Sequence, residues 1–177
     1  MSRPIVQTAL GDAIIKGIVQ FVRADIHTPT SYVRFLSHVN AAPLRQTIAE
    51  GIYGARWIYK LGLVLLVSDD ELLAHCRAQI MEYAAAAEAI IQNMVSQKVT
   101  NMKQWTFKQL INKANSLGII DSRMRWRLHY LRELRNEIHM GRRKKYRFLR
   151  SSKFAYTALC ETIHATRKWK REPPVAM

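Results

Sequence analysis

Several features typical of secreted or β-rich proteins are scarce in this 177-residue chain. Its two cysteines, Cys76 and Cys160, are too few and too far apart for a disulfide framework or a close-spaced metal or redox pair. Seven glycines and five prolines argue against a turn-rich β-sandwich and a collagenous chain. Both cysteines have apolar neighbours at helical spacing, so we expect them in the core of a protein kept in a reducing, cytoplasmic setting.

Long apolar runs are missing too. The most apolar stretch, residues 57–67, contains Lys60 and is far shorter than the ~20 residues that a bilayer span needs. The N-terminal sequence lacks the apolar segment of a secretory signal, so neither export nor membrane insertion is expected. There is no His-x-x-x-His pair and no paired carboxylate cluster, and we therefore expect neither a metal nor a cofactor.

Negative charge is scarce in one half of the chain only. The whole chain has 13 Asp and Glu against 28 Lys and Arg, a formal charge of +15. Residues 1–98 contain nine basic and eight acidic side chains, whereas residues 99–177 contain nineteen and five. This one-sided field attracts polyanions, of which nucleic acid is the commonest, although an anionic membrane surface or an acidic protein fits it too.

Helical periodicity runs through nearly the whole sequence and predicts an all-α fold. Ser68 and Glu71 form an N-terminal capping pattern, Gly118 is suited to end a helix, and Asp121 to cap the next one. Strand-like alternation and Asn-Gly turns are missing. The expected helices are residues 4–24, a segment starting at 28–31, then 43–67, 70–97, 106–116, 122–140 and about 151–169.

The expected helix 122–140 carries the residues most indicative of chemistry. Its polar face has the spacing i, i+3, i+4 and i+7 and consists of Arg132, Arg135, Asn136 and His139. An adjoining apolar stripe would anchor the helix and consists of Met124, Leu131, Leu134 and Ile138. Arginine matches phosphate oxygens with a fork of donors, and histidine transfers protons near neutral pH. The face suits metal-free RNA cleavage by the ribose 2′-OH, while a solvated polar face is the plainer interpretation.

The segment Arg132 to His139, Arg-Glu-Leu-Arg-Asn-Glu-Ile-His, resembles the signature of HEPN domains, an Arg and a polar residue followed by four to six positions and a His. Phe107 to Ala114 resembles that family's Phe-x-x-Leu-Ile-x-x-Ala element. The resemblance implies a HEPN-like antiparallel four-helix bundle over residues 69–170. Extra N-terminal helices of unknown role, residues 1–68, would precede it, and a loose tail, residues 171–177, would follow.

The same resemblance implies a metal-independent endoribonuclease, of the kind that acts as a toxin or in antiphage defence. Such a domain forms a homodimer whose motif helices face each other, and a neutralising antitoxin or another protein would be its partner. The catalytic residues it implies are Arg132, Arg135, Asn136 and His139. The spacing leaves open which arginine is the catalytic one.

Further basic residues around the motif are expected to bind nucleic acid: Arg125, Arg142, Arg143, Lys144, Lys145 and Arg147. Trp126 and Tyr130 alternate with arginines, a combination that single-stranded RNA binding uses. His129 and His164 are expected to be surface or packed residues. Two other functions stay open: a noncatalytic module that binds RNA, DNA or an acidic partner, and a structural subunit of a larger assembly.

Overall fold

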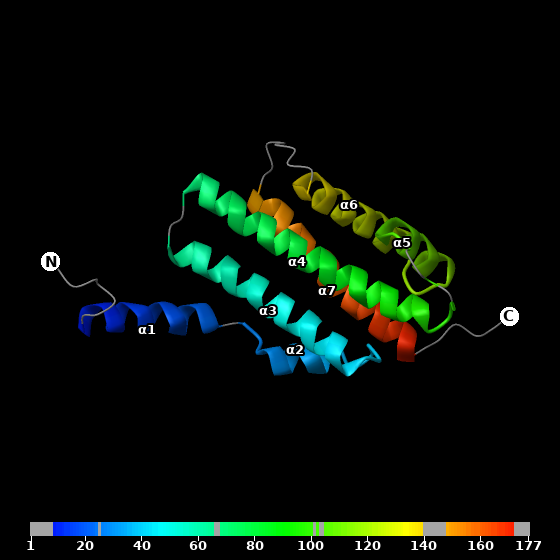
Figure 1. The fold of residues 1–177 in the computed structure, drawn as a ribbon, viewed down its shortest axis with the longest axis horizontal. Helices are drawn as coiled ribbons and strands as arrows, with labels where there is room; N and C mark the ends of the chain where they lie inside the picture. The colour runs from blue at the N-terminus through cyan, green and yellow to red at the C-terminus, as the bar shows by residue number, and fades with distance from the viewer. Residues whose placement is uncertain are drawn as a thin grey trace.

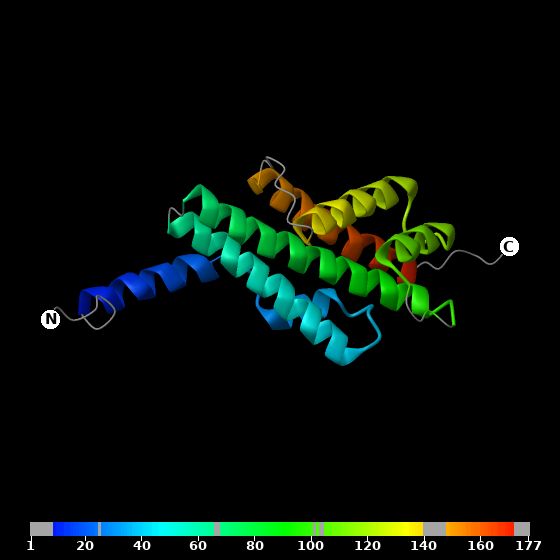
Figure 2. The ribbon, with the colours of Figure 1, turned by 45° about the horizontal axis from the view of Figure 1, so that its top comes forward.

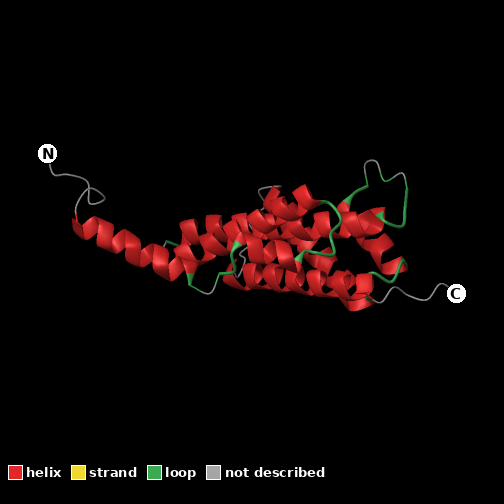
Figure 3. Cartoon of the chain, turned by 90° about the horizontal axis from the view of Figure 1, so that it is seen from below, coloured by secondary structure: helices red, strands yellow, loops and turns green. Residues whose placement is uncertain are grey.

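The computed structural model describes residues 9–24, 26–65, 68–100, 102, 105–139 and 148–171, and every regular element within these ranges is an α-helix (Figure 3). The all-α prediction is therefore confirmed for this part of the chain. The helices are α1 Ala9–Arg23, α2 Pro29–Phe35, α3 Ala42–Val64, α4 Asp69–Ser96, α5 Phe107–Ser116, α6 Ser122–His139 and α7 Phe148–Arg171.

The helix boundaries follow from local capping. Ser68 accepts a hydrogen bond from the Glu71 amide at 3.4 Å, and the Glu71 carboxylate accepts one from the Ser68 amide at 2.8 Å, a complete capping box for α4. Thr106 and Gln109 form the same device at α5. Gly118 has φ +66°, a left-handed conformation in which the chain leaves α5 and turns toward α6. Asp121 then accepts the Met124 amide at 2.7 Å and starts α6.

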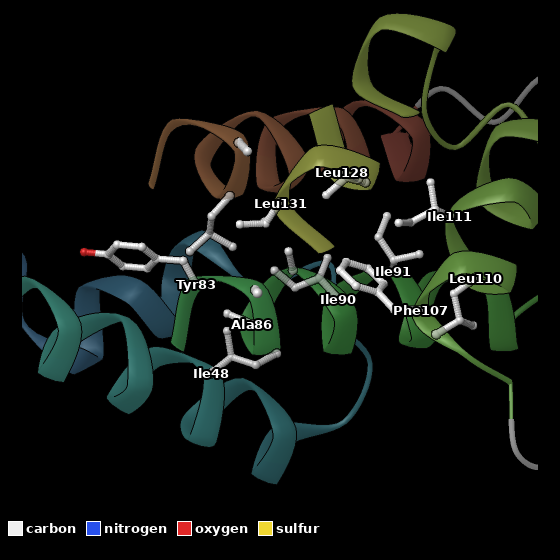
Figure 4. Close-up of a cluster of buried hydrophobic side chains, with 14 of the residues drawn as sticks. Ile48, Tyr83, Ala86, Ile90, Ile91, Phe107, Leu110, Ile111, Leu128 and Leu131 are labelled. Carbon is white, nitrogen blue, oxygen red and sulfur yellow. The ribbon is translucent and has the colours of Figure 1, made fainter. Parts of the chain in front are cut away.

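Helix α4 lies at the centre of the molecule and contacts α3, α5, α6 and α7. It runs parallel to α7, because Gln79 bonds Ser152 near the start of both helices and Gln97 accepts from Lys170 at 2.7 Å near their ends (Figure 1). Helices α3 and α6 run in the opposite direction. The core side chains meet on α4, where Ile90 and Ile91 are fully buried among Phe107, Ile111 and Leu128 (Figure 4).

The N-terminal helices differ in how they join this core. Tyr32 and Leu36 at α2 and Ile48 and Ile52 of α3 belong to the same buried cluster as α4. Helix α1 instead contacts α3 near its own C-terminal end, where Val22 is buried, and projects away from the rest (Figure 1). The division of the chain at residue 68 stays a prediction.

Two expectations need adjustment. Helix α7 begins at Phe148, before the Ser151-Ser152 pair that we expected to open it. Cys160 is exposed, whereas Cys76 is buried as expected, and burial raises the pKa of the Cys76 thiol to about 11. The ends of the expected helices at residues 4–8, 66–67 and 140 lie outside the described residues. In the described part, no helix is long and apolar enough to cross a bilayer.

Candidate nucleic-acid interface on helix α6

Helix α6 is fixed by an apolar stripe on its inner side. Met124, Leu128, Leu131 and Leu134 are all buried, and Ile138 packs against the same core. Fully burying one such leucine contributes about 2 kcal/mol, so the stripe sets the rotation of α6 about its axis. The predicted anchoring stripe is thereby confirmed, and the polar side chains of α6 occupy its two flanks.

Arg135, one of the four motif residues, points toward the interior. Its guanidinium forms an ion pair with Glu88 of α4 and lies 5.3 Å from the centre of the Phe107 ring at the start of α5. The side chains of Arg135 and Glu88 are 19% and 27% exposed. Arg135 therefore connects α6 to α4 and α5, and its charge is already partnered.

The other three motif residues lie on the neighbouring flank of α6, where the Arg132 side chain is 18% exposed, no more than that of Arg135. Arg132 pairs at 3.2 Å with Glu133, its neighbour in the chain, whose side chain is 58% exposed. Asn136 and His139 are exposed, and neither side chain is hydrogen-bonded to any residue that the structure describes. The predicted face thus separates into one arginine that is paired with α4 and a group of three on the neighbouring flank, of which Asn136 and His139 are exposed.

This group of three continues toward the N-terminus of α6. Residues 125, 129, 132, 136 and 139 follow the spacing i, i+4, i+7, i+11 and i+14, which is one flank of a helix. We call this row the α6 polar stripe, and its members are Arg125, His129, Arg132, Asn136 and His139.

Asn112 of α5 orders the first half of the stripe. Its Oδ1 accepts a hydrogen bond from Arg125 Nε at 3.0 Å and lies 3.1 Å from His129 Nε2. Because arginine only donates, the Asn112 atom is the amide oxygen, and His129 Nε2 must carry a proton to bond it. His129 Nδ1 is then the ring nitrogen that remains to accept a proton in the neutral imidazole.

His129 is kept neutral by its surroundings. Partial burial lowers its pKa, and the nearby charges of Arg132 and Arg125 lower it further. A neutral, oriented imidazole beside two guanidinium groups is an arrangement that can accept a proton while cations hold an anion. Sequence reasoning set His129 aside, although its spacing from Arg125, Arg132 and Asn136 carried the signal.

The remaining predicted contacts fall in two groups. Arg125 lies on the stripe, whereas Arg142, Arg143, Lys144, Lys145 and Arg147 lie outside the described residues. Among the residues described, no group of three or more His, Cys, Asp and Glu side chains is arranged to hold a metal ion.

Comparison with models of known protein families, with curated proteins and with solved structures gave no match. The geometry of α6 and its neighbours is therefore the basis on which a function can be argued.

Proposed function

We propose that this protein is a HEPN-like, metal-independent endoribonuclease whose active surface is the α6 polar stripe. The observation that carries the proposal is the row of Arg132 with the exposed Asn136 and His139 along one flank of a helix packed into the core, within the strongly basic half of the chain. The class of fold that the motif implies, a four-helix bundle with the motif on its third helix, is part of the same proposal.

The spacing of the three residues suits one phosphodiester. Arg132 and Asn136 are one turn apart, and His139 follows on the next turn, so the row spans about 10 Å along the axis. A phosphate above Asn136 lies within reach of the Arg132 guanidinium on one side and the His139 imidazole on the other. His139 takes the proton from the ribose 2′-OH as this oxygen attacks the phosphorus, and Arg132 stabilises the charge on the phosphoryl oxygens. The products are a 2′,3′-cyclic phosphate and a 5′-OH end.

The proposal includes a second copy of the chain. Returning a proton to the leaving 5′ oxygen needs an acid on the opposite side of the phosphorus. His129 lies about 15 Å from His139 along α6, which is too far for both to serve one phosphate in the same chain. His129 is also kept neutral, so it is not this acid. Two α6 helices that face each other would place the His139 of the second copy beside the same phosphate, and its imidazole, in the protonated form, would give the proton to the leaving 5′ oxygen. Toxin or defence activity, restrained by a partner protein, is the biological role that fits such an enzyme.

One observation favours the noncatalytic alternative. Arg135 is occupied by Glu88, so each chain offers fewer free cations at the motif than its sequence suggests. A stripe with Arg125 and Arg132 but without a correctly positioned acid would bind RNA and leave it intact.

Cleavage tests the proposal directly. Purified protein is incubated with a labelled RNA in EDTA, and the 3′ ends are examined for cyclic phosphate. We expect cleavage by the wild type and a rate at least about 100-fold lower for His139→Ala, the contribution typical of acid–base catalysis. His27→Ala, which removes an exposed histidine near the start of α2, is the matched control. Equal rates for His139→Ala and His27→Ala would contradict the mechanism, and salt-dependent binding without cleavage by any of the three proteins would favour the alternative.

A further inference from the structure

A groove of about 680 Å³ lies on the other flank of α6, where α6 and the turn before it meet α7. Its volume falls in the range of small-molecule and nucleotide sites. The groove is not part of the α6 polar stripe, since its α6 residues are Arg123, Met124 and Arg127. Helices α6 and α7 adjoin along this flank (Figure 2).

The floor of the groove is apolar and its sides are basic. Ile119, Met124 and Trp169 line it and are 2%, 5% and 7% exposed. Arg123 of α6 and Lys168 of α7 also line it, and both are exposed. Neither of them has an ion pair or hydrogen bond with another residue in the described chain.

The two carboxylates in the groove are already engaged. Asp121 accepts the Met124 amide as the cap of α6, and Glu161 pairs with Arg127 Nε at 2.7 Å. The groove therefore contains three cations, Arg123, Arg127 and Lys168, against these two carboxylates, and its charge is net positive. An apolar floor between free cations is complementary to a ligand that is flat and apolar in one part and anionic in another.

An aromatic ring stands next to this groove. Trp126 is 64% exposed and lies one helical turn from Arg123. Tyr130 stacks on one side of the indole, with ring centres 5.9 Å apart and planes 2° from parallel, and Phe154 of α7 holds Tyr130 in an edge contact at 4.8 Å. The indole is thus held in place by a supported neighbour while its other face is open to a partner ring.

We propose that the α6–α7 groove and Trp126 bind single-stranded RNA: a base stacks on Trp126, and the phosphates that follow contact Arg123 and Lys168. This inference rests on the proposed function for the choice of RNA as ligand. Base stacking on an exposed aromatic ring beside cations is a sequence-tolerant way to hold a single strand. The groove then acts as a substrate-holding site, separate from the residues that cut.

Binding is measured on a His139→Ala background, in which the RNA stays intact, by the fluorescence anisotropy of a labelled 12-nucleotide RNA over a range of salt concentrations. The Arg123→Ala/Lys168→Ala variant is compared with Lys16→Ala/Arg23→Ala, which removes two exposed cations of α1. The groove variant should lower the slope of log K against log salt by about 1.4, because each phosphate contact on a single strand contributes about 0.7. The α1 variant should leave the slope unchanged, and equal slopes for the two variants would overturn the inference.

Trp126→Ala supplies the second measurement. Loss of one stacked base should weaken RNA binding about fivefold or more without changing the salt slope. Inorganic polyphosphate, an anion without bases, serves as the competitor. If Trp126→Ala has no effect, and polyphosphate displaces RNA as well as unlabelled RNA does, the groove is an anion site only and the inference fails.

The two proposals can fail separately. The wild type could bind RNA through Arg123, Lys168 and Trp126 and yet cleave none. This result would refute the ribonuclease proposal and would agree with RNA binding in the groove. Conversely, cleavage could depend on His139 and still proceed at the wild-type kcat/KM in the groove variants. This result would refute RNA binding in the groove and would agree with the ribonuclease proposal.

Discussion

The ion pair between Arg135 and Glu88 leads to the sharpest structural prediction. Arg135→Ala removes a charge-assisted hydrogen bond between side chains that are about four-fifths buried, and also the contact with Phe107. Such a bond contributes about 1.5–3 kcal/mol and the contact with the aromatic ring about 1 kcal/mol, while removing the arginine also removes the cost of about 2 kcal/mol for ordering its side chain. We expect a net loss of about 0.5–2 kcal/mol in the free energy of unfolding.

A double-mutant cycle isolates the pair. Urea unfolding of Arg135→Ala, Glu88→Ala and the double variant should give a coupling energy of about 1–2 kcal/mol, and the first substitution alone should lower the urea midpoint by up to about 1 M. The matched cycle uses Arg132→Ala and Glu133→Ala. Adjacent residues on a helix do not face each other, and the Glu133 side chain is 58% exposed, so this pair should couple by no more than about 0.5 kcal/mol.

The comparison also separates the two arginines by role. If Arg135 is structural and Arg132 binds phosphate, Arg135→Lys should lower stability and leave cleavage unchanged under native conditions, while Arg132→Lys should do the reverse. Equal coupling energies in the two cycles, or a coupling energy of Arg135 with Glu88 below about 0.5 kcal/mol, would refute this assignment.

Two further predictions concern the scaffold. Burial and the Arg167 charge lower the pKa of His38 to about 4, against 6.5 in the unfolded chain. Between these two pH values the folded state therefore binds fewer protons than the unfolded state, so the free energy of unfolding should fall as the pH drops from 6.5 toward 4. His38→Gln should flatten this decline in urea titrations at pH 7 and pH 5, and an unchanged decline would disprove the assignment. Gly118→Ala should lower the free energy of unfolding by about 1–2 kcal/mol, because a residue with a Cβ is strained at φ +66°. The added Cβ meets no atom within 4 Å, so no steric clash adds to this cost. Thermal unfolding measures the loss, and unchanged stability would mean that the turn adopts another conformation.

The helices could be predicted because their signals are local. Ser68 with Glu71, Gly118 and Asp121 act within three or four residues of the ends that they define, so the sequence alone contains both partners. The early start of α7 was missed because Phe148 begins the helix without such a signal and simply continues the helical period of Ser151. Helix boundaries of this kind depend on packing against α4, which a local pattern does not contain.

The candidate site was predictable only in part. The spacing of Arg132, Asn136 and His139 gives a shared face, and the structure does bring them to one flank. The partner of Arg135, however, is Glu88, 47 residues away in the chain, and no local pattern indicates that pairing. His129 was missed for the same reason, because its importance depends on Asn112 of α5.

The amphipathic pattern of α1 shows another limit of sequence reasoning. The period correctly predicts an apolar face, yet Ile14, Ile15 and Phe21 are 47%, 40% and 49% exposed. A helical period indicates that one face of a helix is apolar, but it does not identify the residues that cover this face. The positive charge shows the same limit. The composition reveals the overall excess of basic residues, but it does not show that they lie on two different flanks of α6.

The placement of basic residues on two flanks of α6 affects how an RNA strand would lie on the protein. Between the α6 polar stripe and Trp126, the exposed ridge of the helix carries Glu133, which projects a carboxylate with 58% exposure. A strand on the proposed path from the groove to the stripe passes near this carboxylate, which is paired with Arg132. We propose that the two basic flanks bind RNA as separate surfaces. Removing Arg123 and Lys168 should then raise KM for a long RNA and leave kcat at saturation near the wild-type value, because the residues around His139 are untouched.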